Sequence, residues 1–283
     1  MDGISRRAAL KGGALLGSAM GLGSIASTAS AYPRLPSERY DFTRPQDNLD
    51  ALMRIQGDSS GAATFMYARG RAYAALPGEL PRYMSDMQAV RASRFFRNDD
   101  GSYDQHYFAV VYIVDPVNGE YLEAFENPIN GHVGKTYVRG ARLLILRHGY
   151  NGSRWIDPET GAVNPENPWA YNYLDPFLLI WSGAGDVGWC FHQTPFVAQN
   201  FSWNDHNKWR FSMTDLDGEK SSIPATFSFH GEGPYWSWTG LADGYQTYQM
   251  YGGKCATAQD IPAVILNNLE RLHPEVLAGP PAP

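Results

Sequence analysis

The stretch that decides the fold is Thr64-Phe65-Met66-Tyr67-Ala68-Arg69-Gly70-Arg71-Ala72-Tyr73. Successive side chains of a β-strand point to opposite faces, so the large residues share one face and the small residues share the other with Met66. The large face holds Phe65, Tyr67, Arg69, Arg71 and Tyr73. The pattern therefore predicts a long strand with two unlike faces.

Further strand patterns follow, separated by turn residues such as Pro, Asn and Gly. They are expected at 106–114, 120–126, 135–146, 177–181, 187–191, 209–214, 225–230, 235–239 and 245–251. The turn Asp115-Pro116-Val117-Asn118-Gly119 predicts a hairpin between the first two. Strands and helices do not alternate, which argues against a parallel sheet. We predict an all-β fold, mainly an antiparallel barrel or sandwich, lipocalin-like in outline.

Two helices are expected beside the strands. Residues 47–55 predict a short helix capped by Asp47 or Asn48. Residues 258–273 predict a C-terminal helix, because Ile261, Ile265 and Leu269 recur on one face. The segment 150–173 is rich in Asn, Pro and Gly and is expected to be a long surface loop.

The N-terminus has the pattern of an export signal. Ser5-Arg6-Arg7-Ala8-Ala9-Leu10-Lys11 pairs two arginines before a weakly apolar run, and Ala29-Ser30-Ala31 offers a cleavage site. Residues 1–31 are therefore predicted to be a twin-arginine signal peptide, and residues 32–283 a single all-β domain. The protein is expected to be exported folded by the twin-arginine machinery, to the periplasm or beyond the cell.

Composition limits the partners. The formal net charge is −6, which argues against nucleic acid or anionic lipid. Aromatic residues make up 13% of the chain, which suits a small aromatic substrate as well as a plain apolar core. A homo-oligomer is left open. So is the state of Cys190 and Cys255, which either pair in an oxidising compartment or stay reduced and buried.

Common cofactor motifs are missing from the sequence after residue 31. There is no phosphate-binding loop and no Cys/His spacing typical of a metal site. We therefore expect no cofactor and no metal. Histidines on different strands keep a metal-dependent enzyme as a lesser alternative, because sequence does not show whether they converge.

The large face of residues 64–73 holds the first catalytic candidates. If it points into a barrel, Arg69 and Arg71 need carboxylates or a ligand anion, since burying an unpaired guanidinium costs several kcal/mol. An arginine beside Tyr67 also favours the phenolate. The alternative is that this face is exterior and both arginines are solvated.

Other candidates lie on or near the ends of later strands. His106 and Tyr112 share a strand face, and His192 follows Cys190; each is a candidate catalytic residue, although a lone histidine is more often structural. The candidate ligand-binding residues are mostly aromatic. They are Tyr73, Trp181, His230, Trp236, Trp238 and Tyr251.

Two motifs resemble those of a known family. The first is Tyr67-Ala68-Arg69-Gly70-Arg71-Ala72-Tyr73 with Pro77-Gly78-Glu79. The second is Tyr112-Ile113-Val114-Asp115-Pro116, then Gly119-Glu120, Leu122, Asn127-Pro128 and Gly131. The chain resembles, over about residues 50–255, a bacterial and fungal domain family of unknown function, many bacterial members of which carry twin-arginine leaders. It departs from the family pattern at Ile129-Asn130-Gly131-His132, where Trp/Tyr-Thr-Gly-Glu is commoner.

The resemblance implies an all-β, barrel-like fold, and some relatives are associated with lignin-derived phenylpropanoid dimers from which formaldehyde is released. We therefore expect a cofactor-independent lyase or isomerase acting on a phenolic small molecule, with Arg69, Tyr67 or Tyr112 at the phenolate and His106 or His192 as base. The alternative is a lipocalin-like carrier for an apolar ligand without turnover, which predicts that Arg69 and Arg71 face outward.

Overall fold

The computed structural model describes residues 35, 37–136, 141–149, 152–162, 179–197 and 202–283. Residues Arg34–Pro283 form the second of the two units into which the chain divides. The expected export signal lies outside the described residues, and the fold below is that of the second unit. No described helix is long and apolar enough to cross a membrane.

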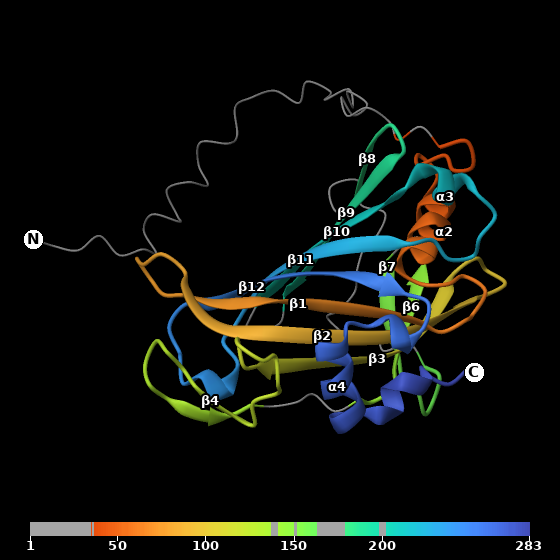
Figure 1. The fold of residues 1–283 in the computed structure, drawn as a ribbon. Coiled ribbons are helices and arrows are strands. Elements are labelled where there is room, and N and C mark those ends of the chain that lie inside the picture. Colours follow the sequence, from red (N-terminus) through yellow and green to blue (C-terminus); the bar gives the residue numbers. More distant parts are fainter. Residues whose placement is uncertain (1–34, 36, 137–140, 150–151, 163–178, 198–201) are drawn as a thin grey trace, which may run out of the picture. The chain divides into compact units, whose positions relative to one another are not determined.

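The second unit is built on one ten-stranded antiparallel sheet (Figure 1). Its strand order is β7-β6-β3-β2-β1-β12-β11-β10-β9-β8. The strands are β1 (Thr64–Ala75), β2 (Arg82–Arg97), β3 (Tyr103–Val114), β6 (Leu144–Gly149), β7 (Gly152–Ile156), β8 (Leu179–Ala184), β9 (Val187–Val197), β10 (Ser202–Ser212), β11 (Ala225–Gly233) and β12 (Tyr245–Cys255). The all-β antiparallel prediction is confirmed.

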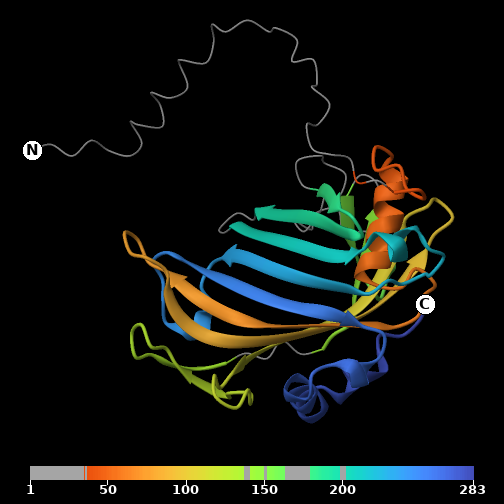
Figure 2. The same ribbon diagram turned by 45° about the horizontal axis from the view of Figure 1, so that its top comes forward.

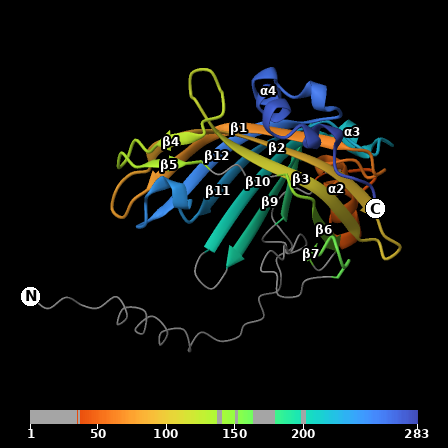
Figure 3. The ribbon, with the colours of Figure 1, turned by 90° about the horizontal axis from the view of Figure 1, so that it is seen from below.

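The sheet is strongly curved, and a helix covers each side. α2 (Pro45–Gln56) lies on the concave face, and α4 (Ala263–Leu272) lies on the convex face (Figure 2). Seen from below, the two ends of the sheet bend to the same side (Figure 3). The described strands stay open, with β7 and β8 at the edges. The sheet is therefore barrel-like without closing.

The concave face of β1 is its small face. Ala68 and Ala72 are buried there, and α2 packs Leu49, Leu52 and Met53 into the same apolar cluster. Small side chains leave room for the helix and for the large residues of neighbouring strands. The sequence alone does not decide which face of β1 is the inner one, and the structure shows that it is the face with the small side chains.

The convex face carries the large residues of β1. Tyr67 packs at the margin of an apolar cluster that includes Val90, Tyr112 and Ile265, whereas Arg69 and Arg71 are exposed. The interpretation that Arg69 and Arg71 point inward is therefore wrong. The physical reason is desolvation, because solvent on the convex side spares two guanidinium groups the cost of burial.

Several predicted elements need correction. The longest strand, β2, was missed because polar and charged residues interrupt both of its faces. Residues 120–126 do not form a full hairpin with β3: the chain returns through a bridge between Val114 and Tyr121, and β4 (Ala124–Glu126) then pairs with β5 (Val133–Lys135) in a separate sheet. The predicted strand 135–146 is divided between β5 and β6.

One expected loop and one expected strand also differ from the structure. Residues 152–156 form β7 within the expected loop, and the rest of that segment from 163 lies outside the described residues. The expected strand 235–239 contains instead the short 3-10 helix η2 (Ser237–Thr239). β8 and β9 form an antiparallel hairpin, and β10 pairs antiparallel with β11, with a short helix, α3 (Met213–Asp217), in the connection.

Proline sets the helix starts. α2 begins at Pro45 after Arg44, and neither Asp47 nor Asn48 caps it. The C-terminal helix is shorter than predicted: η3 (Ala258–Asp260) is followed by Pro262, and α4 begins at Ala263. Proline lacks a backbone N–H, so it fits the start of a helix better than its interior.

The C-terminal segment is fastened to the convex face. The Tyr112 hydroxyl lies 2.9 Å from Nδ1 of His273, and Nδ1 of His106 lies 3.1 Å from the Pro281 carbonyl oxygen. Asn268 of α4 donates to Gln88 of β2 at 2.9 Å. These contacts hold α4 and the chain end on β2 and β3.

Both cysteines are free and buried. Cys190 belongs to the apolar cluster on the concave face, and Cys255 belongs to the cluster under α4. Of the two alternatives drawn from sequence, the structure therefore has the reduced and buried one.

We predict that Ile265→Ala lowers the free energy of unfolding by about 2–5 kcal/mol, because Ile265 is fully buried between α4 and the sheet. Denaturation with urea measures the change. Val264→Ala on the same helix is the matched control, because Val264 is 36% exposed. This substitution is expected to change the free energy of unfolding by no more than about 0.5 kcal/mol. Equal effects of the two changes would contradict the packing described for α4.

Candidate functional site

The predicted catalytic residues divide between the two faces of the sheet. Tyr67, Arg69 and Arg71 share one face, as predicted, and that face is the convex one. Arg71 pairs with Asp86 across the strands, its Nε 3.4 Å from Oδ1. None of these three residues points into the concave side.

His106 and Tyr112 also lie on the convex face, beneath the C-terminal segment. His106 contacts the Pro281 carbonyl and Tyr112 contacts His273, so both side chains fasten the chain end. Burial raises the pKa of the Tyr112 hydroxyl, which makes its phenolate harder to form. Both residues therefore have structural roles in this fold.

His192 is the predicted catalytic residue that lies on the concave face. Register across β9 and β10 pairs it with Asn207, and the same row continues through Phe229 and Met250 of the concave face. Its side chain is 3% exposed. His192 thus sits in a protected position on the inner side.

Two further basic residues approach His192 from distant strands. Arg91 of β2 and His148 of β6 both lie on the concave face. The charge of Arg91 acts on both histidines, and His192 acts on His148. Six strands separate β6 from β9 in the sheet, so this interaction reflects the curvature that brings the two ends together. We call Arg91, His148 and His192 the inner basic cluster.

His148 is fixed by two hydrogen bonds. Its Nε2 lies 2.9 Å from Oε1 of Gln105, an oxygen that only accepts, so Nε2 carries the proton. Its Nδ1 lies 2.8 Å from Oγ of Ser153 and accepts from that hydroxyl. The Nε2 amide of Gln105 donates in turn to Oγ of Ser93 at 3.0 Å. This chain of contacts leaves His148 neutral and rigid, a positioning residue rather than a base.

Both inner histidines are neutral at physiological pH. Burial, followed by the charge of Arg91, lowers the pKa of His148 and of His192 to about 3. A neutral imidazole accepts a proton, whereas a guanidinium beside it stabilises an anion. The cluster therefore combines a base and a fixed cation in a low-dielectric surrounding.

Aromatic side chains share the concave side with this cluster. Tyr248 stacks on Trp236 and lies beside Phe229, and Trp209 packs on Phe227. Trp209 Nε1 and the Gln246 amide are buried without a hydrogen-bond partner among the described residues. Unsatisfied buried polar groups are costly, and a bound oxygen-bearing molecule would satisfy them.

The predicted ligand-binding residues are divided in the same way. Trp181 stacks on Phe42 and packs, with Trp236 and Trp238, against the concave cluster. His230 lies on the convex side, where its Nε2 is 3.3 Å from Oε1 of Glu232. Tyr73 and Tyr251 line a groove on the convex face. The predicted set is therefore not one site.

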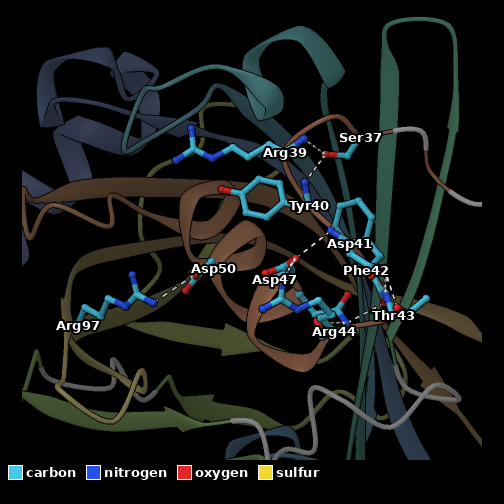
Figure 4. A network of polar contacts seen from close by, with 11 residues as sticks. Ser37, Arg39, Tyr40, Asp41, Phe42, Thr43, Arg44, Asp47, Asp50 and Arg97 are labelled. Atoms are coloured by element: carbon cyan, nitrogen blue, oxygen red, sulfur yellow. Dashed lines mark hydrogen bonds and ion pairs between the residues drawn. The ribbon is translucent and has the colours of Figure 1, made fainter.

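A second polar region surrounds the start of α2 and is structural (Figure 4). A hollow of about 290 Å³ lies there, but its charged groups are engaged. Arg97 pairs with Asp50, and Arg39 donates to the Gly218 carbonyl. Arg54 donates to the carbonyls of Leu216 and Lys220 and to the Tyr40 hydroxyl. These bonds hold the chain leading into α2 against α3.

Metal coordination has little support in the described part of the chain. Among those residues, no group of three His, Cys, Asp or Glu side chains is placed to hold an ion. His148 already uses both ring nitrogens. The inner cluster is therefore better suited to hydrogen bonding and proton transfer than to holding a metal.

Sequence reasoning missed Arg91 and His148. Arg91 lies within the strand that was not recognised, and its neighbours Ala89 and Ser93 give no apolar signal. His148 lies two residues beyond the end of the predicted strand 135–146. Once β2 is known, an arginine at an inward position of that strand is the signal that identifies Arg91.

Comparison with known families gives one partial match. Residues 61–138 match the model of a family described as a protein of unknown function, DUF1838. This span contains β1, β2 and β3, and thus Arg91, whereas His148 and His192 lie beyond it. The resemblance to a family of unknown function is supported over this shorter span. No curated protein matches the chain.

We predict that the protein loses stability between about pH 6.5 and pH 3. The unfolded chain protonates histidine near pH 6.5, whereas the pKa of folded His148 and His192 is about 3. The unfolded state then binds more protons, so the free energy of unfolding falls as pH decreases, by about 1.4 kcal/mol per pH unit for each histidine.

His148→Gln isolates this effect. Urea denaturation at several pH values is expected to give a shallower decrease for His148→Gln than for the wild type, because one titrating group is gone. Ser153→Ala is the control, since it removes a hydrogen bond to the same imidazole and keeps the titration. Parallel profiles for His148→Gln and the wild type would contradict a buried neutral His148.

Proposed function

We propose that this protein is a cofactor-independent lyase that acts on a two-ring phenolic molecule bound at the concave face of the sheet. The substrate class is a lignin-derived phenylpropanoid dimer with a free phenol and a primary alcohol. The observation that carries the proposal is that Arg91, a cation, and His192, a neutral imidazole, lie on the same concave face within electrostatic reach of each other, a face that also buries aromatic side chains. Export through the N-terminal twin-arginine pattern, to the periplasm or beyond, is part of the proposal.

The inner basic cluster suits the charges of such a reaction. Arg91 would stabilise the phenolate, because a guanidinium in a poorly solvated place favours an adjacent anion. His192 would take the proton of the primary alcohol from within hydrogen-bond reach. A phenolate bound beside it would raise its pKa from the low value of the free protein. His148, bonded to Gln105 and Ser153, would keep the neighbouring strands in place.

The reaction balances without an oxidant or reductant. In a phenylcoumaran, electrons from the phenolate break the benzylic C–O bond and give a quinone methide and an aryl oxide. His192 then removes the alcohol proton, the C–C bond to the hydroxymethyl carbon breaks, and formaldehyde leaves. The released electron pair forms the C=C bond of a stilbene and restores the phenolate. The proton on His192 passes to the aryl oxide.

A carrier without turnover is the second candidate. The outward position of Arg69 and Arg71, which this alternative predicted, favours it. The concave face also buries many purely apolar side chains against α2. A carrier would bind the same ring system and release it unchanged, so product formation separates the two proposals.

The expected result is formaldehyde released in equal amount with a stilbene when the purified protein is incubated with a phenylcoumaran alcohol. His192→Gln is expected to lower kcat by about 100-fold or more, the usual contribution of a general base. A colorimetric formaldehyde assay and absorbance of the stilbene measure both products.

His230→Gln is the matched control, because His230 lies on the convex face. This substitution is expected to leave kcat unchanged. Thermal melting of both variants shows whether each is folded. Binding of the substrate without formaldehyde would favour the carrier. Equal loss in both histidine variants, or turnover by His192→Gln at the wild-type rate, would exclude His192 as the base.

A further inference from the structure

A groove on the convex face is not used by the proposed reaction. It has a volume of about 480 Å³, within the range of small-molecule sites. Its floor is formed by β12, β1 and β2, and its walls by the turn after β3 and the start of α4. Residues that line it include Arg69, Arg71, Gln88, Asn118, Tyr251 and Val264.

Arg69 is a cation of this groove, which Arg71, Asp86 and Asp115 also line. The carboxylates beside it are engaged: Asp86 accepts from Arg71 and from the Tyr83 hydroxyl at 2.6 Å, and Asp115 accepts from backbone N–H groups of its own turn. Arg69 makes no hydrogen bond or ion pair with the residues that the structure describes. Its guanidinium is therefore available to an anion.

The start of α4 also borders the groove. Val264, in the first turn of α4, lines the groove. That turn has no acidic residue, and no side chain caps it. The exposed N–H groups at a helix start favour an anion nearby, within the first turn.

The groove is also rigid and partly aromatic. Asn268 of α4 donates to the Gly119 carbonyl at 2.8 Å, and Gln88 donates to the same oxygen at 3.1 Å, so the turn is tied to the helix and the sheet. Tyr251, which pairs with Arg69 across the strands, is 60% exposed. A fixed wall and an exposed ring reduce the entropic cost of binding a flat molecule.

We propose that this groove binds an aromatic carboxylate, with the carboxylate on Arg69 and the ring against Tyr251. A guanidinium matches the two oxygens of a carboxylate, and the volume accommodates one or two rings. This site is separate from the inner basic cluster, because Arg69 and Arg91 lie on opposite faces of the sheet.

The test is isothermal titration of the full chain with 4-hydroxycinnamate and with its neutral alcohol, 4-hydroxycinnamyl alcohol. Saturable binding of the acid to one site is expected, with weaker binding of the alcohol. Arg69→Gln is expected to raise the Kd of the acid at least about tenfold, equivalent to about 1.4 kcal/mol. Arg210→Gln is the control, an exposed strand arginine outside the groove.

The same titration with His192→Gln separates this site from the reaction site, and binding of the acid is expected to be unchanged. Three results would overturn the proposal: no saturable binding of the acid, equal Kd values for wild type and Arg69→Gln, or an alcohol that binds as tightly as the acid. If inorganic phosphate competes for the groove as well as the aromatic acid itself does, the groove is an unselective anion site. That result would also overturn the proposal.

Discussion

The cost of removing a guanidinium from water determines which way β1 faces. Burying an unpaired arginine costs several kcal/mol, so Arg69 and Arg71 lie on the convex side and the small residues lie inward. Hydrogen bonds between neighbouring strands fix their register, so the orientation of β1 determines which side chains of every other strand face inward. A shift of one residue in that register would exchange the two faces. The concave face becomes the side that accepts α2, and the convex face accepts α4.

Arg91 lies on the concave side in spite of that cost, and its position has chemical meaning. It lies on the concave side and acts on two neutral histidines that reach it from the two ends of the sheet. A half-buried cation beside neutral histidines destabilises a core that only packs, which makes such a cluster a candidate for function. The proposed chemistry therefore belongs to the inner face, whereas the arginines of β1 belong to a separate surface groove.

The class of fold could be predicted from sequence, because the turn residues and alternating strands of 64–73 and 106–114 are local signals. The orientation of β1 could not, since it depends on α2 packing against Ala68 and Ala72. The strand 82–97 carries polar residues on both faces and gave no clear period. His192 was identified because it ends a recognisable strand pattern. Arg91 and His148 needed the curvature of the whole sheet, which no short window of sequence contains.

The most direct measurement is a crystal structure of the protein with a phenylcoumaran whose primary alcohol is methylated. This analogue keeps both rings and the phenol but has no alcohol proton to lose, so it cannot release formaldehyde. We expect the analogue on the concave face, with the phenol oxygen at Arg91 and the ether oxygen near His192. An analogue that is found in the convex groove alone, with the inner basic cluster untouched, would contradict it.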